Sequence, residues 1–179
     1  RRPSAADLHR LMTCSLDLDA AAETFSICVS PAQMMSLQHD LEEELDSITV
    51  YPDAIDALRL LKAVGIATGI CSNLAAPYGP VLRRLLSEVD GFALSYEVGE
   101  MKPHPGIYRD ICHQLGVNSA RGMPPSGERV VMIGDSMQCD RDGPGAIGIS
   151  GFYLDRKVGG AISSLMQFTE HVIEINRAG

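Results

Sequence analysis

Residues 4–48 place apolar side chains three and four positions apart, which is the spacing of one face of an α-helix. The longer of two such stretches has its apolar face at Met34, Leu37, Leu41 and Leu45. Before it, Ser30 can cap the helix, Pro31 suits the first helical position, and Gln33 can complete a capping box. We therefore predict that residues 1–49 form a small subdomain made only of helices.

From residue 50 to residue 179 the pattern changes to helices that alternate with short apolar runs. Continuous apolar runs bounded by Gly or Pro are typical of parallel strands that are buried on both faces. The predicted strands are 66–71, 92–95, 129–134, 147–154 and 172–175, the predicted helices are 52–64, 80–88, 105–115 and 161–168, and 118–128 is a predicted surface loop. This alternation predicts an α/β core with a Rossmann-like, doubly wound parallel sheet and right-handed crossovers.

Charge and composition exclude two classes of partner. The chain has 15 Lys and Arg against 23 Asp and Glu, a net charge of -8, and no basic stripe offsets it. Such a surface repels a polyanion, so nucleic acid is not an expected partner. The chain is 45% hydrophobic and 21% charged, as globular proteins are, and no apolar run is long enough to span a bilayer.

The five cysteines are odd in number, widely spaced and without a CxxC pair. This distribution argues against a disulfide framework and against a structural zinc site. It favours the reducing cytoplasm as the location of the protein.

Polar side chains follow three of the predicted strands. Ser72 and Asn73 come after the strand at 66–71, Lys102 lies in the loop beyond the strand at 92–95, and Asp135 follows the strand at 129–134. In an open parallel sheet, ligands bind at the carboxyl ends of the strands. We therefore expect these side chains to line one crevice.

Each of these clusters also has an ordinary structural interpretation. A Ser-Asn pair can cap a helix, but the Ser72 hydroxyl and nearby amides can equally hold a phosphate oxygen. Most lysines are solvated, yet Gly99 and two prolines stiffen the loop of Lys102, as an inward-pointing ammonium requires. Gly-Asp-Ser can form a simple turn, whereas Asp135 directly after a buried strand is well placed to bind a hard cation.

The order and spacing of the clusters resemble a known family. Cys71-Ser72-Asn73, Gly99-Glu100-Met101-Lys102-Pro103, and Gly134-Asp135-Ser136 with Asp140 are similar to the second, third and fourth motifs of the haloacid dehalogenase superfamily. Lys102 follows Ser72 by 30 residues, Asp135 follows Lys102 by 33, and the resemblance extends from Tyr51 to Arg156. Most members of this superfamily hydrolyse phosphoesters through a covalent aspartyl intermediate. The resemblance implies that residues 1–49 form part of a helical cap, and that this cap covers an α/β core formed by residues 50–179.

The resemblance also implies a role for each matched residue. Ser72 and Asn73 would bind the phosphate, and Lys102 would pair with the nucleophile and the phosphoryl group, so Lys102 and Ser72 are the expected catalytic residues. Asp135 would ligate Mg²⁺, with Asp140 supporting that metal site. Dehalogenases of the superfamily need neither a metal nor a carboxylate at this position, so Asp135 favours the magnesium phosphatase branch.

The first motif of the superfamily, an apolar strand followed by Asp-x-Asp, is not evident. The nearest match is Leu16-Asp17-Leu18-Asp19, but residues 12–15 make a poor buried strand and Ala20-Ala21 replaces the expected Gly-Thr. We interpret this stretch as a link between cap helices, and we expect the nucleophilic aspartate and the central strand to lie upstream of Arg1. A central strand contributes about 10 kcal/mol through some five apolar side chains, comparable to the whole stability of a domain, about 5–15 kcal/mol. We therefore expect a further N-terminal segment of the natural protein, or another segment that fills the gap, and no activity from these residues alone.

The leading hypothesis is a phosphatase that hydrolyses a small phosphorylated metabolite with Mg²⁺ through an aspartyl-phosphate intermediate. The alternative is a non-catalytic homologue that binds an anionic ligand or a protein partner. A receiver-type phosphoacceptor domain fits less well, because its acidic pair comes early and its lysine late. The natural substrate and the oligomeric state do not follow from the sequence.

Overall fold

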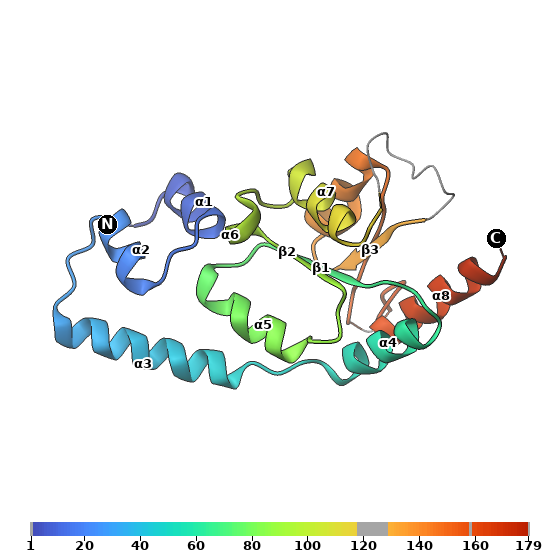
Figure 1. Cartoon of the computed structure of the whole chain (residues 1–179), viewed down its shortest axis with the longest axis horizontal. Coiled ribbons are helices and arrows are strands. Elements are labelled where there is room, and N and C mark those ends of the chain that lie inside the picture. Colours follow the sequence, from blue (N-terminus) through green and yellow to red (C-terminus); the bar gives the residue numbers. More distant parts are fainter. Residues whose placement is uncertain (1, 118–128, 158, 179) are drawn as a thin grey trace.

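The structure, a computed structural model, describes residues 2–117, 129–157 and 159–178 and has an α/β fold (Figure 1). The helices are α1 (Ala5–Thr13), α2 (Leu18–Thr24), α3 (Pro31–Ser47), α4 (Pro52–Ala63), α5 (Gly79–Leu85), α6 (Ser95–Val98), α7 (Pro105–Gln114) and α8 (Leu165–Ala178). The strands are β1 (Gly69–Ser72), β2 (Gly91–Leu94), β3 (Val131–Gly134) and β4 (Ser150–Tyr153), and shorter turns are η1 (Ala76–Tyr78), η2 (Met137–Asp142) and η3 (Gly143–Ile147). None of the described helices has both the length and the apolar character that crossing a membrane requires. The α/β class predicted from the sequence is confirmed, and the predicted loop at 118–128 lies outside the described residues.

The described strands form two separate parallel sheets of two strands each. β1 pairs with β2 so that Ser72 lies opposite Leu94, and β3 pairs with β4 so that Gly134 lies opposite Tyr153. Within the described ranges no backbone pairing joins the two sheets. The single sheet expected from the sequence is therefore present as two halves, because no described strand pairs with the second edge of β1 or of β3.

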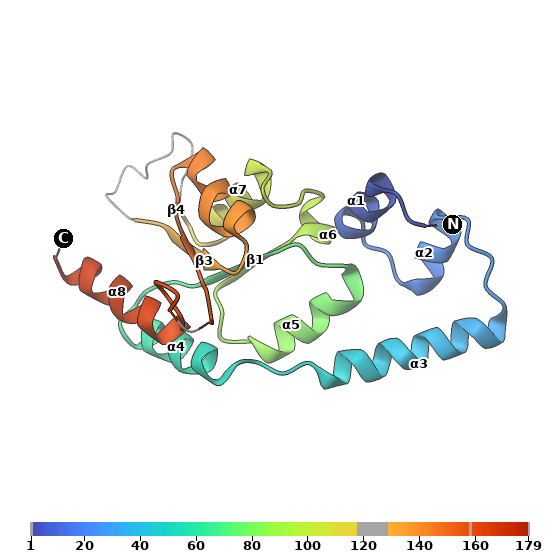
Figure 2. The same cartoon turned by 180° about the vertical axis from the view of Figure 1, so that it is seen from behind.

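Helix α7 joins the two halves through a common core (Figures 1 and 2). Its buried residues Ile107, Tyr108, Ile111 and Cys112 form one cluster with Ala93 of β2 and with Ile147 and Ile149 before β4. On the other face of β2, Phe92 and Leu94 pack against Leu82 of α5. Because alternate residues of a strand point to opposite faces, Ala93 packs in the first cluster and Phe92 and Leu94 pack in the second. All residues of β2 are therefore buried.

β1 and β3 are less buried than β2. All residues of β3 and the last three of β1 are only half-buried, whereas every residue of β2 is buried. The middle strands of a doubly wound sheet are covered on both faces and are normally the most buried. Within the described residues, β1 and β3 each have one edge without a strand partner, and both strands are more exposed than β2.

Helices α1, α2 and α3 lie to one side of the core and contact it at few points (Figures 1 and 2). The capping box predicted for α3 is present: Gln33 N–H donates to Ser30 Oγ, and Ser30 N–H donates to Gln33 Oε1. The main link to the core is the fully buried hydroxyl of Ser95, which donates to Met12 O at 2.6 Å and accepts from Leu74 N–H at 2.9 Å. One buried side chain thus connects α1 to the loop that follows β1.

The strand predicted at 172–175 is wrong, because these residues belong to α8. The alternating letters of this segment resemble a strand, but Phe168, Thr169 and Ile173 are buried together on one helical face that packs against α4 (Figure 2). The predicted strands are also shorter than expected: β1 begins at Gly69, and β4 begins after the η3 turn. For residues 172–175, the packing of α8 against α4 favours a helix over the strand that the local sequence pattern predicts.

Thr169 provides a test of the α4–α8 packing. Its hydroxyl is buried, with the residue 1% exposed, and has no hydrogen-bond partner in the described part of the chain. A buried hydroxyl without a partner costs about 1–3 kcal/mol. We expect Thr169→Val to raise the free energy of unfolding by about 1 kcal/mol in urea denaturation.

Ser95→Ala is the matched control, because it removes a buried hydroxyl that does have partners. It leaves Met12 O and Leu74 N–H unpaired and should lower the free energy of unfolding by about 1–3 kcal/mol. Two variants that change stability in the same direction would contradict this interpretation of Thr169.

Candidate active site

A buried ion pair lies at the carboxyl ends of the strands. Lys102 Nζ donates to Asp140 Oδ1 at 2.6 Å, and the two side chains are only 12% and 4% exposed. Lys102 belongs to the loop of residues 99–104 between α6 and α7, and Asp140 belongs to η2 after β3. The pair therefore connects segments that follow the two different sheets.

The other oxygen of Asp140 is fixed by the chain around Gly134. Ser136 N–H donates to Asp140 Oδ2 at 2.9 Å, and Ser136 Oγ accepts from Cys139 N–H at 3.1 Å. A Cβ at Gly134 would lie 2.3 Å from Asp140 Oδ2, so only glycine permits this approach. Both oxygens of Asp140 are thus engaged by groups of this chain, which suits a supporting role better than direct metal ligation.

Asn73 is bonded to the backbone of Lys102 at both ends of its amide. Asn73 Nδ2 donates to Lys102 O at 3.0 Å, and Lys102 N–H donates to Asn73 Oδ1 at 2.7 Å. The loop itself turns through Gly99 in the left-handed region at φ 79° and is closed by the His104 N–H bond to Met101 O. The Lys102 peptide is therefore held from the end of β1.

Ser72 and Asp135 complete the group. Ser72 is the last residue of β1 and is half-buried, while Asp135 directly follows β3 and is exposed. Neither side chain bonds to another described residue. A connected hydrogen-bond network runs from Asn73 through Lys102 and Asp140 to Ser136. Its first residue, Asn73, follows Ser72 in the chain, and its last residue, Ser136, follows Asp135. A hydroxyl, an ammonium and a free carboxylate thus lie along one edge of the core.

Apolar surroundings beneath the pair keep two titratable groups neutral. Burial is the main cause that raises the pKa of the Cys71 thiol to about 12; the Lys102 ammonium acts to lower this pKa, and the Asp140 carboxylate acts to raise it. Burial also raises the pKa of Tyr108, whose hydroxyl donates to Cys139 O at 2.6 Å. At neutral pH neither group adds charge below the site.

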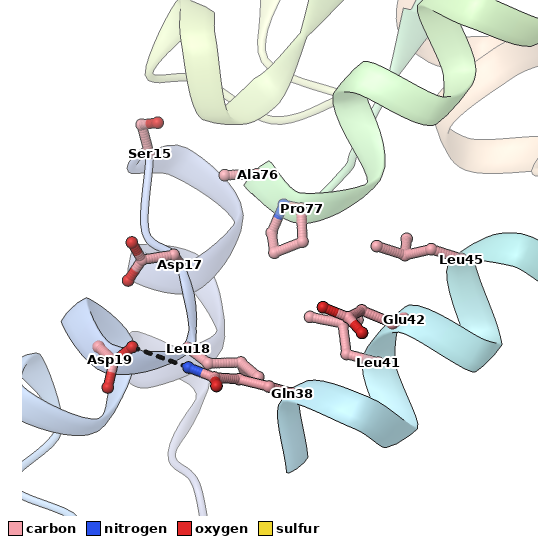
Figure 3. A pocket seen from close by; sticks show the side chains of 10 residues that line it. All are labelled: Ser15, Asp17, Leu18, Asp19, Gln38, Leu41, Glu42, Leu45, Ala76 and Pro77. Carbon is pink, nitrogen blue, oxygen red and sulfur yellow. Dashed lines mark hydrogen bonds between the residues drawn. The ribbon is translucent and has the colours of Figure 1, made fainter. Parts of the chain in front are cut away.

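A hollow of about 720 Å³ opens beside Lys102, lined by His9 of α1 and by residues 99–105. A second hollow, of about 480 Å³, lies between α2, α3 and η1 (Figure 3). Figure 3 shows that Asp17, Asp19 and Glu42 line this second hollow together with apolar side chains. Three carboxylates make it unfavourable for a phosphate. The hollow beside Lys102 is also lined by the carboxylate of Glu100, and neither Ser72 nor Asp135 lines either hollow.

Asp17 and Asp19 have structural partners in the helical segment. Asp17 Oδ1 caps α2 by accepting from Ala20 N–H at 2.8 Å, and Asp19 Oδ2 accepts from Gln38 Nε2 at 3.1 Å (Figure 3). Residues 14–17 join α1 to α2, and among residues 2–68 the structure contains no strand. Leu16 and Asp17 lie in this link, whereas Leu18 and Asp19 already belong to α2, so the interpretation of residues 16–19 as a link between helices is correct for the first two residues only.

The structure brings together the residues singled out from the sequence, but it also shows contacts that the sequence does not reveal. Lys102 bonds directly to Asp140, Ser72 precedes Asn73, and Asp135 precedes Ser136, and both Asn73 and Ser136 bond into the same network. The attachment of Asn73 to the Lys102 backbone spans 29 residues, and no local pattern indicates it. Ser95 was missed for the same reason: its partner Met12 is 83 residues away.

Comparison with known proteins places this arrangement in one family. A family model described as haloacid dehalogenase-like hydrolase matches residues 16–148. Among curated proteins, an (S)-2-haloacid dehalogenase 1 of Pseudomonas sp. strain CBS-3 is 28% identical over 157 residues, which are 84% of this chain. A phosphoglycolate phosphatase of Rhodospirillum rubrum is 34% identical over 107 residues, which are 56% of this chain.

Among solved structures, a HAD phosphatase from Thermococcus onnurineus shares the fold with a TM-score of 0.63 at 22% identity, over 87% of this chain and 70% of that one. The chain spans 61% of the length of the Pseudomonas relative and 39% of the length of the Rhodospirillum relative.

Removal of Lys102 should be far more costly than removal of an exposed lysine. Lys102→Met leaves the Asp140 carboxylate buried without its cation, so the free energy of unfolding should fall by about 3–5 kcal/mol. Lys62 is the matched control: its ion pair with Glu88 is 3.7 Å long and more than half exposed, so Lys62→Met should cost less than about 1 kcal/mol. Equal losses in urea denaturation would show that the buried pair is not stabilising.

The Cys71 thiol makes stability depend on alkaline pH. Its pKa is about 12 in the folded protein against an ordinary value of 9.0, so the unfolded chain loses this proton first. The contribution of Cys71 to the free energy of unfolding therefore keeps its full value below pH 9. It falls as the pH rises from 9 to 12, by up to about 1.4 kcal/mol per pH unit. Cys71→Ser should show a shallower decline of unfolding free energy over this range. Cys28→Ser, which removes an exposed thiol, controls for the substitution itself.

Proposed function

The chain belongs to the haloacid dehalogenase-like hydrolases, and from this membership we propose that the protein is a Mg²⁺-dependent phosphatase that acts on a small phosphorylated metabolite. The observation that supports it best is the network that runs from Asn73 through the buried Lys102 ammonium and Asp140 to Ser136. Ser72 directly precedes Asn73, and the exposed Asp135 directly precedes Ser136, so both side chains lie next to this network. These groups can bind a doubly negative phosphate through a hydroxyl, a fixed positive charge and a shared cation.

Ser72 and Lys102 act on the phosphate itself. The Ser72 hydroxyl donates to one phosphate oxygen, and the Lys102 ammonium faces the charge that develops in the transition state. At an effective dielectric of about 20, a positive charge about 4 Å from a phosphoryl oxygen is worth roughly 4 kcal/mol. The 2.6 Å contact with Asp140 holds the Lys102 ammonium in place.

The residues at the end of β3 fit a magnesium ion. Mg²⁺ usually takes one or two carboxylates and fills its other positions with water and substrate oxygens. Asp135 is exposed and has no partner among the described side chains, so it can supply one carboxylate, while Asp140 supports the loop. When bound, the ion would neutralise the phosphate oxygens.

The nucleophile in this proposal is an aspartate outside residues 1–179. It attacks phosphorus, the alcohol leaves, and water then releases phosphate from the aspartyl phosphate. Two observations support this assignment: Asp17 and Asp19 are occupied in the helical segment, and β1 and β3 each have an unpaired, half-buried edge within the described core. Residues 1–179 alone are accordingly proposed to be inactive.

Dehalogenation is the second candidate, because one curated relative is a haloacid dehalogenase at 28% identity. Displacement of halide from carbon needs no metal, so a dehalogenase does not need the carboxylate of Asp135 as a metal ligand. The presence of Asp135 therefore favours phosphate transfer.

The test uses the natural full-length protein with p-nitrophenyl phosphate. We expect turnover that requires Mg²⁺, is abolished by a chelator, and falls roughly a hundredfold or more in Asp135→Asn. Asp142→Asn is the matched control, since Asp142 is exposed, bonds only to Arg141 among the residues that the structure describes, and should not affect turnover.

Three results would contradict the proposal. Turnover that is unchanged in Asp135→Asn would remove the metal role, and chloride release from 2-chloropropionate without phosphatase activity would identify a dehalogenase. Phosphate binding without either reaction would indicate the non-catalytic homologue.

A further inference from the structure

The amide of Asn73 is used on the protein rather than on a ligand. Its oxygen accepts from Lys102 N–H at 2.7 Å and its nitrogen donates to Lys102 O at 3.0 Å. This pair of bonds fixes both polar groups of one residue in the way a neighbouring strand would. Asn73 is thereby attached to the loop of the catalytic ammonium, although the family resemblance alone would assign it to the phosphate.

We propose that Asn73 is a positioning residue that sets the location of the Lys102 ammonium. The effect on the reaction rests on the phosphatase function proposed above, whereas the effect on Lys102 itself does not. The backbone of Lys102 is held from β1 by Asn73, and its Nζ reaches Asp140 beyond β3. Since the two sheets share no described backbone pairing, the reach of this side chain depends on where its peptide is fixed.

Loss of the Asn73 amide leaves the loop with few other fixed points. Besides the Lys102–Asp140 pair, the loop retains the bond from His104 N–H to Met101 O, the bond from Gly106 N–H to His104 Nδ1 at 3.3 Å and the exposed pair of His104 with Glu100 at 2.7 Å. None of these contacts attaches the loop to β1. In Asn73→Ala, the Lys102 peptide can therefore move away from the site, and its ammonium becomes more accessible to water.

The chain contains a matched control for this substitution. Gln114 of α7 bonds to Phe92 in the same double manner, with Phe92 N–H donating to Gln114 Oε1 and Gln114 Nε2 donating to Phe92 O, both at 2.9 Å. Phe92 lies near the start of β2, away from the carboxyl end where Lys102 lies. Gln114→Ala therefore removes an equivalent pair of backbone bonds without touching the proposed site.

The first experiment needs no substrate. The natural full-length protein and both variants are treated with limiting acetic anhydride, and acetylation of Lys102 is measured by mass spectrometry relative to the exposed Lys62. We expect acetylation of Lys102 to rise several-fold in Asn73→Ala and to stay unchanged in Gln114→Ala. Unchanged acetylation in Asn73→Ala, or an equal rise in both variants, would overturn the proposal.

The second experiment separates positioning from phosphate binding. With p-nitrophenyl phosphate and Mg²⁺, Asn73→Ala should lower kcat roughly ten- to a hundredfold, as a displacement of about 1 Å does, with little change in KM. In a Lys102→Ala background the same substitution should cause no further loss, because Asn73 acts through Lys102. A rise in KM alone, or a full additional loss in that background, would overturn positioning and assign Asn73 to the substrate.

The two experiments can refute the two proposals independently of each other. Absence of phosphate hydrolysis by the unmodified protein would refute the proposed function, while acetylation of Lys102 would still decide whether Asn73 positions it.

Discussion

The arrangement of the site depends on one buried ion pair. A lysine and an aspartate that are almost fully removed from water must meet each other, because either charge alone would be costly there. Lys102 and Asp140 come from segments that follow different sheets, so their contact fixes the distance between those segments. Two residues support Asp140 in this contact: Gly134 leaves room for its carboxylate, and Ser136 N–H donates to it. Asn73 supports Lys102 by accepting from its backbone N–H.

Much of the fold could be predicted from local patterns. The capping box of α3, the prolines that begin α4 and α7, and the apolar runs of β2 and β3 are local signals, and the elements lie close to where those signals place them. The C-terminal segment could not be predicted in this way. Its letters fit both a strand and a helix, and burial of Phe168 and Ile173 against α4 favours the helix.

The site shows the same division between residue identity and partner. Strand ends and motif spacing predicted Ser72, Lys102, Asp135 and Asp140 as candidate site residues. They did not indicate the partners of Asn73 and Asp140, which bond to Lys102 across 29 and 38 residues. A side-chain amide, with one oxygen and one nitrogen, and a carboxylate, with two oxygens, can each bond to a ligand or to the protein, and only the neighbours in space decide between the two.

The two half-sheets explain why a side-chain network carries so much of this geometry. In a continuous sheet, backbone bonds between adjacent strands would set the relative height of Ser72 and Asp135. Here the described strands supply no such bonds between β1 and β3, and α7 together with the Asn73, Lys102 and Asp140 contacts bridges them instead. Apolar packing on α7 is tolerant of small shifts, whereas hydrogen bonds of 2.6–3.0 Å are not. The polar contacts therefore define the alignment of the two sheet ends, and the apolar core supplies the stability that lets them do so.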